Sequence, residues 1–170
     1  KKKKNADNNG DRNVAVCSNA LGASGSNSDN IAIGLRAMFS NGSGSENVAI
    51  GTKTMDQGNG GTQNVAIGYK ALENGGNQQQ NIAIGWQALK DCSGGFQNTV
   101  IGDDAMNLSV NAWGCVAIGD GALQQVEGVV NIGIGQSAGS SLTSGGSNVL
   151  IGRNSATSLT TGDNNIVIGY

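Results

Sequence analysis

One short motif recurs along this chain at a nearly constant spacing, and this repeat constrains the fold more than any other feature. An Asn, a hydrophobic tripeptide and a Gly follow one another at Asn30–Gly34, and a degenerate first copy lies at Asn13–Cys17. Further copies begin at Asn47, Asn64, Asn81, Asn98, Cys115, Asn131, Asn148 and Asn165. The copies keep a 17-residue spacing, except that the interval from Cys115 to Asn131 is shorter by a single residue. A fixed short period over most of a chain is typical of a solenoid, in which each repeat forms one coil.

The residues within one repeat predict the path of the coil. Counting the Asn as position 1, the apolar residues at positions 2–4 favour a short strand, and the Gly at position 5 permits a turn. A small and a large apolar residue recur at positions 8 and 9, as in Ala71-Leu72, and the rest is rich in turn-forming Gly, Asn and Ser. We therefore predict an all-β parallel β-solenoid of about ten 17-residue coils over residues 13–170, after a flexible polar and basic leader or tag at residues 1–12. We expect these residues to be a fragment of a longer chain.

Stacking of the coils would turn each repeat position into a column along the solenoid. The position 1 column can form a ladder in which each Asn side chain bonds the one in the next coil, as stacked Asn does in cross-β assemblies. The alternative is that Asn merely tolerates a tight turn. The predicted ladder residues are Asn30, Asn47, Asn64, Asn81, Asn98, Asn131, Asn148 and Asn165.

Side chains alternate across a strand, so positions 2 and 4 share one face and position 3 lies on the other. We predict that positions 2 and 4 form the core, with Ile33, Ile50, Ile67, Ile84, Ile101, Ile118, Ile134 and Ile151 at position 4. The position 3 column is also apolar, where a lone solenoid would present polar residues to water. We therefore predict an oligomer interface at Ala32, Ala49, Ala66, Ala83 and Ala117.

The later repeats depart from the pattern at positions 8 and 9. Gly139 and Ala156 replace the usual Leu or Met, and Ser155 replaces the usual Ala. We expect the core there to be narrower or differently filled.

The motif Asn-Val-Ala-Ile-Gly-x-x-Ala-Leu, followed by Gly-, Asn- and Ser-rich turns, resembles the head repeats of YadA-like trimeric autotransporter adhesins. The 17-residue spacing is similar to that of related repeats in bacteriophage tail fibre proteins. The resemblance covers residues 13–170 and implies a left-handed parallel β-roll packed as a homotrimer. It implies a structural, non-enzymatic fibre segment for host-cell attachment, most simply part of a phage tail fibre on a virion. The alternative that it implies is the adhesive head of an autotransporter at the bacterial cell surface, which is also extracellular.

Composition argues against several other functions. The chain has no His, and its net charge of −2 lacks the basic stripe that nucleic acid binding requires. No apolar stretch reaches the roughly 18 residues of a membrane span. Cys17, Cys92 and Cys115 occupy three different repeat positions, so we expect neither a disulfide framework nor a metal site. We expect no cofactor and no catalytic residues; a solenoid enzyme or an ice-binding protein ranks low, because acidic groups and Thr form no regular array.

Aromatic side chains interrupt the small and polar residues of the turns. Tyr69 and Trp86 share position 6 in adjacent repeats, so we expect their rings to stack. Such a column can bind a host surface glycan or receptor; the alternative is that it covers the seam of an oligomer. Phe96 and Trp113 mark, with the shorter repeat near Cys115, the place where the surface departs most from uniformity.

Overall fold

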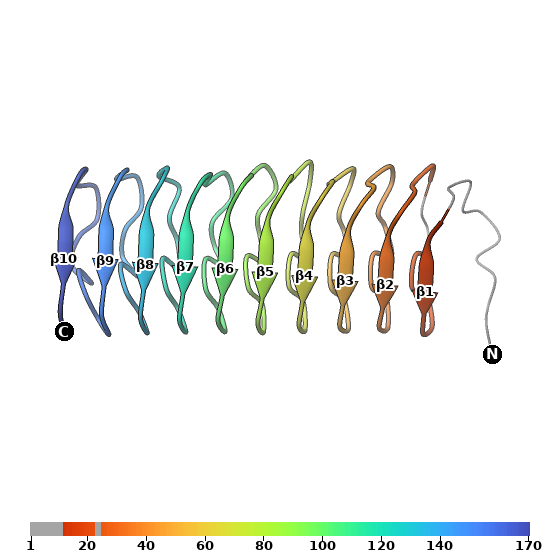
Figure 1. The fold of residues 1–170 in the computed structure, drawn as a ribbon, viewed down its shortest axis with the longest axis horizontal. Coiled ribbons are helices and arrows are strands. Elements are labelled where there is room, and N and C mark those ends of the chain that lie inside the picture. Colours follow the sequence, from red (N-terminus) through yellow and green to blue (C-terminus); the bar gives the residue numbers. More distant parts are fainter. Residues whose placement is uncertain (1–11, 23–24) are drawn as a thin grey trace.

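The computed structural model describes residues 12–22 and 25–170, and these residues fold as a β-solenoid (Figure 1). Ten parallel strands of three residues form one sheet in sequence order. The strands are β1 (Val14–Val16), β2 (Ile31–Ile33), β3 (Val48–Ile50), β4 (Val65–Ile67), β5 (Ile82–Ile84), β6 (Thr99–Ile101), β7 (Val116–Ile118), β8 (Ile132–Ile134), β9 (Val149–Ile151) and β10 (Ile166–Ile168). The predicted all-β parallel solenoid is confirmed; the predicted leader lies outside the described residues, except for Arg12.

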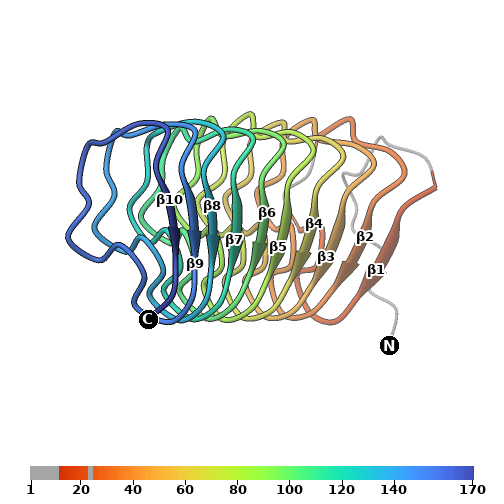
Figure 2. The same cartoon turned by 60° about the vertical axis from the view of Figure 1, so that its left-hand side comes forward.

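Each repeat forms one coil, and the coils nest along a common axis (Figure 2). We number the coils from Asn13, so that coil 4 begins at Asn64 and coil 7 begins at Cys115. Neighbouring strands pair position by position, as in Ala66 with Ala83 and Val116 with Ile132. The members of the second pair are closer in sequence by a single residue, yet the register of the strands is unchanged. The missing residue is therefore absorbed in the turn of coil 7.

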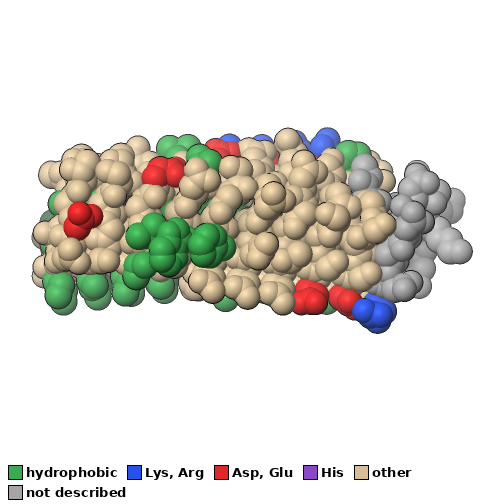
Figure 3. All heavy atoms as spheres, turned by 90° about the horizontal axis from the view of Figure 1, so that it is seen from above, with side chains coloured by type: hydrophobic (Ala, Val, Ile, Leu, Met, Phe, Trp, Pro, Cys, Tyr) green, Lys and Arg blue, Asp and Glu red, His purple; other side chains and the backbone are tan. Residues whose placement is uncertain are grey.

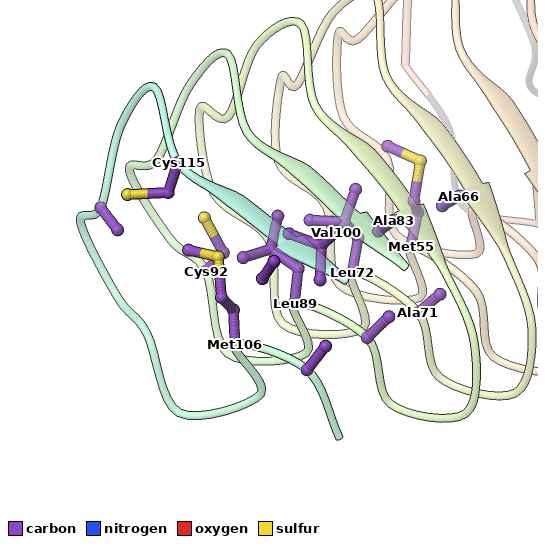
Figure 4. Packing of buried hydrophobic residues seen from close by; sticks show 14 of the residues in the cluster. Met55, Ala66, Ala71, Leu72, Ala83, Leu89, Cys92, Val100, Met106 and Cys115 are labelled. Atoms are coloured by element: carbon purple, nitrogen blue, oxygen red, sulfur yellow. The ribbon is translucent and has the colours of Figure 1, made fainter. Parts of the chain in front are cut away.

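The interior of the solenoid is lined by position 3 of the strands and by positions 8 and 9 of the opposite side. Ala66, Ala83 and Val100 face Leu72, Leu89 and Met106 inside the coils (Figure 4), and all six side chains are 0% exposed. Gly133 shows how narrow this interior is, because a Cβ added there would lie 2.6 Å from Leu123 Cγ. Most coils thus combine a large side chain at position 9 with an Ala at position 3.

This packing reverses the predicted assignment of the two strand faces. The predicted interface residues Ala32, Ala49, Ala66, Ala83 and Ala117 are fully buried inside their own chain. The predicted core residues Ile33, Ile50, Ile67, Ile84, Ile101, Ile118, Ile134 and Ile151 point outward and are half-buried or exposed. The prediction was wrong because both columns are apolar, and the Leu and Met of position 9 leave room inside only for the smaller column.

The later coils are filled differently, as expected. Gly139 replaces the large residue at position 9, and Leu150 at position 3 takes its space, because a Cβ on Gly139 would lie 2.5 Å from Leu150 Cδ1. Leu142, at position 12, is also fully buried in this region. The core therefore keeps its apolar filling while the contributing positions change.

The predicted Asn ladder is confirmed. In a typical rung, Oδ1 of Asn64 accepts hydrogen bonds from the backbone N–H of Asn81 at 3.0 Å and from its side-chain Nδ2 at 3.2 Å. Nδ2 of Asn81 also donates to the Gly95 carbonyl of its own coil at 2.9 Å. Cys115 replaces one rung, and its Sγ lies 3.4 Å from the backbone N–H of Asn131. From Asn30 to Asn148, each Asn of the ladder thus closes its own coil and joins it to the preceding one.

Left-handed residues form the corners of each coil. In coil 4, Gly68 has φ 131°, and Lys70, Leu72 and Gln80 have φ values of 60°, 52° and 58°. A Cβ on Gly68 would lie 2.3 Å from the carbonyl oxygen of Gly85 in the next coil. Position 5 therefore needs Gly both for its backbone conformation and for the close stacking of the coils.

Candidate functional site

The outward side of the sheet forms a continuous apolar surface, which we call the Val/Ile face. It consists of positions 2 and 4 of all ten strands, and each of these positions holds Val or Ile except Thr99. Exposed fractions include 48% for Val14, 37% for Ile31, 36% for Ile50 and 39% for Ile82. Charged side chains are absent from these positions, so nothing within the strands interrupts the surface.

The Val/Ile face is long for the surface of a single chain. Ten parallel strands about 4.8 Å apart extend over about 45 Å. Contiguous apolar surfaces of this kind mark sites of association with another molecule. The β-branched side chains also have few rotamers, so their burial against a partner costs little conformational entropy.

Position 17 borders the Val/Ile face on the side where the strands begin. A chain of side-chain hydrogen bonds runs along this border: Gln63 donates to Glu46 at 2.9 Å, Gln80 to Gln63 at 3.2 Å and Gln97 to Gln80 at 3.1 Å. The ion pair of Arg12 with Asp29 lies at the N-terminal end of the same column. The hydrogen bond from Arg12 lowers the pKa of the Asp29 carboxyl. The border is therefore polar over coils 1–5 and its side chains are held by one another.

The predicted stacking of Tyr69 on Trp86 is confirmed, with ring centroids 6.3 Å apart and an interplanar angle of 18°. The two rings belong to adjacent coils, so their faces are directed along the solenoid axis and their edges outward. Beyond Trp86 the same position holds Asp103, whose Oδ1 accepts a hydrogen bond of 3.1 Å from the Trp86 backbone N–H. A ligand-binding role for Tyr69 and Trp86 stays a prediction.

A second aromatic pair lies at position 16, on the wall where the chain approaches the strands. Phe96 and Trp113 stack with centroids 5.6 Å apart and an angle of 8°, and they are 43% and 39% exposed. Figure 3 shows this wall, and hydrophobic side chains gather there in one compact patch. The sequence contained the signal for this stack, since the two rings occupy the same position of adjacent repeats.

The buried thiols are placed in the interior and not at a reactive surface. Burial raises the pKa of Cys92 to about 11 and also raises the pKa of Cys115. Cys17 is exposed, and all three cysteines are free. Within residues 12–22 and 25–170, no group of three or more His, Cys, Asp or Glu side chains is arranged to hold a metal ion. These observations leave the outer surfaces as the candidate functional sites.

The described part of the chain contains no helix that is long and apolar enough to span a membrane. Comparison with protein-family models, with curated proteins and with solved structures gives no match to this chain.

Proposed function

We propose that this chain is a structural, non-enzymatic segment of a homotrimeric fibre that serves host-cell attachment, as in a phage tail fibre. The observation that carries the proposal is the Val/Ile face. The interior of the solenoid is already filled by Ala, Leu and Met, while this second apolar surface leaves a large part of its Val and Ile side chains exposed in a single chain. Copies of the same chain are the partners that fit it.

Identical copies match one another because the face repeats at every coil. Two parallel copies at the same height present Val and Ile to Val and Ile along the whole sheet. Burial of the exposed part of each side chain would contribute on the order of 0.5–1 kcal/mol. Summed over the ten strands, this contribution is comparable to or exceeds the cost of about 4–15 kcal/mol for association.

The number of copies follows from the resemblance of the repeats to those of trimeric fibres and adhesins. Three copies around an axis parallel to the solenoids would turn their Val/Ile faces inward and leave the turns outside. The motif Asn-Val-Ala-Ile-Gly also favours a second candidate function, the adhesive head of a bacterial trimeric autotransporter adhesin. In both functions the turns would contact the cell.

The oligomeric state tests the proposal directly. Native mass spectrometry and light scattering at micromolar concentration should give three times the mass of the chain. Ile84→Lys together with Ile118→Lys should give monomers, because both charges would lie within the Val/Ile face. Gln87→Lys is the matched control, since position 7 holds Lys70 one coil earlier, and it should stay trimeric. A wild-type monomer would contradict the assembly.

The attachment role needs a separate measurement. Fluorescently labelled trimer should bind intact cells of some strains in a panel of bacteria, and excess unlabelled protein should compete. Labelled Ile84→Lys/Ile118→Lys protein should bind more weakly, because a monomer loses the avidity of three linked copies. Absence of binding to every strain, with trimers confirmed, would leave the protein as a purely structural spacer.

A further inference from the structure

The position 16 column changes its chemical character over four successive coils. It holds Trp113, then Val129, then Gly146 and then Asp163. Backbone hydrogen bonds fix this order: Val130 N–H donates to the Trp113 carbonyl, Ser147 N–H to the Val129 carbonyl and Asn164 N–H to the Gly146 carbonyl, each at 3.0 Å. Along the wall, the column therefore passes from a bulky ring to a short side chain, then to a position without a side chain and finally to a carboxylate.

This order leaves one face of the Trp113 ring partly open. Phe96 covers the other face, since the two rings stack at 5.6 Å with an angle of 8°. On the side of coil 7 the same position holds Val129, whose side chain is much shorter than an indole, and Gly146 beyond it has no side chain, while Trp113 is 39% exposed. We call this arrangement of Trp113, Val129, Gly146 and Asp163 the aromatic step.

The dimensions of the aromatic step suit a single sugar ring. Coils are about 4.8 Å apart, so about 14 Å separates the level of Trp113 from that of Asp163. A ring in van der Waals contact with the indole, about 4 Å away, would lie over Val129. A Cβ added to Gly146 would lie 3.6 Å from Val129 Cγ2 and 3.9 Å from Asp163 Oδ1, which places Val129 and Asp163 on either side of the space above Gly146.

The polar groups of the aromatic step match the hydroxyls of a carbohydrate. Oδ1 of Asp163 accepts a hydrogen bond of 2.7 Å from the Gly146 N–H, which fixes the orientation of the carboxylate and leaves Oδ2 to accept from a ligand. Ser147, next to Gly146, is exposed and can donate or accept. On the face shown in Figure 3, the Lys and Arg side chains lie away from the hydrophobic patch, which favours a neutral ligand over a phosphate or sulfate.

We propose that the aromatic step is a carbohydrate-binding site for a neutral glycan, with Trp113 stacking on the apolar face of one sugar ring and Asp163 accepting from its hydroxyls. The proposal rests on the attachment function proposed above and names its ligand class. It assigns binding to Trp113 rather than to Trp86. At position 6 the coil directly after Trp86 holds Asp103, whose carboxylate hydrogen bonds to the Trp86 backbone, so a polar side chain lies at the level where a sugar ring would have to stack. It also places the site on a wall beside the Val/Ile face, where it stays accessible when copies assemble through that face.

Titration of the full chain with neutral oligosaccharides tests the proposal. Maltotriose, cellotriose, chitotriose and mannotriose would be added at millimolar concentration, with saturation-transfer NMR and tryptophan fluorescence as readouts. We expect at least one of them to bind. Trp113→Ala should weaken that binding by about tenfold or more, and Gly146→Gln should do the same by filling the space above Gly146. Trp86→Ala is the matched control and should leave the affinity unchanged.

Several results would overturn the assignment. These are no binding of any trisaccharide, an affinity that Trp113→Ala does not change, or an affinity that Trp86→Ala lowers equally. Binding of choline without any sugar would also overturn it, because a cation between a ring and a carboxylate would then be the ligand. Cell binding that survives Trp113→Ala would refute this site while leaving the attachment function intact. Sugar binding by a trimer that binds no cell would refute the attachment function while leaving this site intact.

Discussion

Glu127 accepts a hydrogen bond from the backbone N–H of Val110 at 2.7 Å through Oε1, and its Oε2 accepts one of 3.0 Å from the next backbone N–H, that of Asn111. One coil earlier, the corresponding N–H groups of Ser93 and Gly94 both donate to the Val110 carbonyl at 3.1 Å. Coil 7 is one residue shorter in this turn, and a carboxylate there replaces the missing backbone acceptor.

Removal of this carboxylate should loosen the turn of coil 6. We expect Glu127→Ala to lower the free energy of unfolding by about 1–2 kcal/mol, since two N–H groups lose a charged acceptor. Urea denaturation followed by circular dichroism would measure this. Glu46→Ala is the control, because Glu46 accepts only from the Gln63 side chain at an exposed site, and it should change stability by less than about 0.5 kcal/mol. Equal effects of the two substitutions would argue against the idea that the Glu127 carboxylate replaces the missing backbone acceptor.

Position 5 offers a test of coil stacking with an internal control. Gly85 and Gly169 have nearly the same φ, 139° and 141°. A Cβ on Gly85 would lie 2.4 Å from the Gly102 carbonyl oxygen, whereas a Cβ on Gly169 would meet nothing within 4 Å. We expect Gly85→Ala to cost about 3 kcal/mol or more and Gly169→Ala only the backbone strain, about 1 kcal/mol. Similar losses from the two variants in urea denaturation would show that the φ value alone requires Gly.

Gln78 is a polar side chain inside the solenoid. It is 0% exposed, and neither Nε2 nor Oε1 has a hydrogen-bond partner among the protein groups. Its amide fills the space that Gly75 leaves, since a Cβ on Gly75 would overlap it. We expect Gln78→Leu, of similar size, to raise the free energy of unfolding by about 1 kcal/mol, because an unsatisfied buried amide is removed.

The exposed neighbour Gln79 provides the comparison, and Gln79→Leu should leave the thermal midpoint almost unchanged. A lower midpoint for Gln78→Leu than for the wild type would mean that the buried amide binds something in solution that stabilises it.

Stability should fall at alkaline pH through Cys92. The pKa of this thiol is raised from 9.0 to about 11 by burial, so the unfolded chain loses the proton at a lower pH than the folded one. The unfolded state is then favoured increasingly as the pH rises from 9 to about 11, with a total effect on the order of 2–3 kcal/mol. Cys92→Val should flatten this pH dependence, and it is a suitable substitution because Val126 occupies the same repeat position. An unchanged slope in chemical denaturation between pH 8 and pH 11 would contradict this assignment.

The repeat period predicted much of this structure, because stacking in register turns sequence spacing into spatial contact. The pairing of Ala66 with Ala83, the bond of Asn64 to Asn81 and the stack of Tyr69 on Trp86 all follow from the repeat spacing. The Phe96–Trp113 stack could have been predicted in the same way.

The period could not decide which face of the strand is inside, since an apolar pattern is the same on both faces. That choice depends on the distance across the coil, which Leu and Met at position 9 determine from the opposite side. A sequence signal for it exists in the compensation of Gly139 by Leu150, which links position 9 to position 3 and not to position 4. Accordingly, Ile67→Asp should impair assembly rather than unfold its coil.

The short turn of coil 7 shows that the register of the strands is independent of the length of the turns. The strand register passes through this coil unchanged although one residue is missing, so the sheet does not depend on the exact length of the turns. Turns can therefore gain or lose residues, and with them new side chains, while the Val/Ile face keeps its geometry. In the proposed fibre, such a chain would change what its turns recognise without altering how its copies fit together.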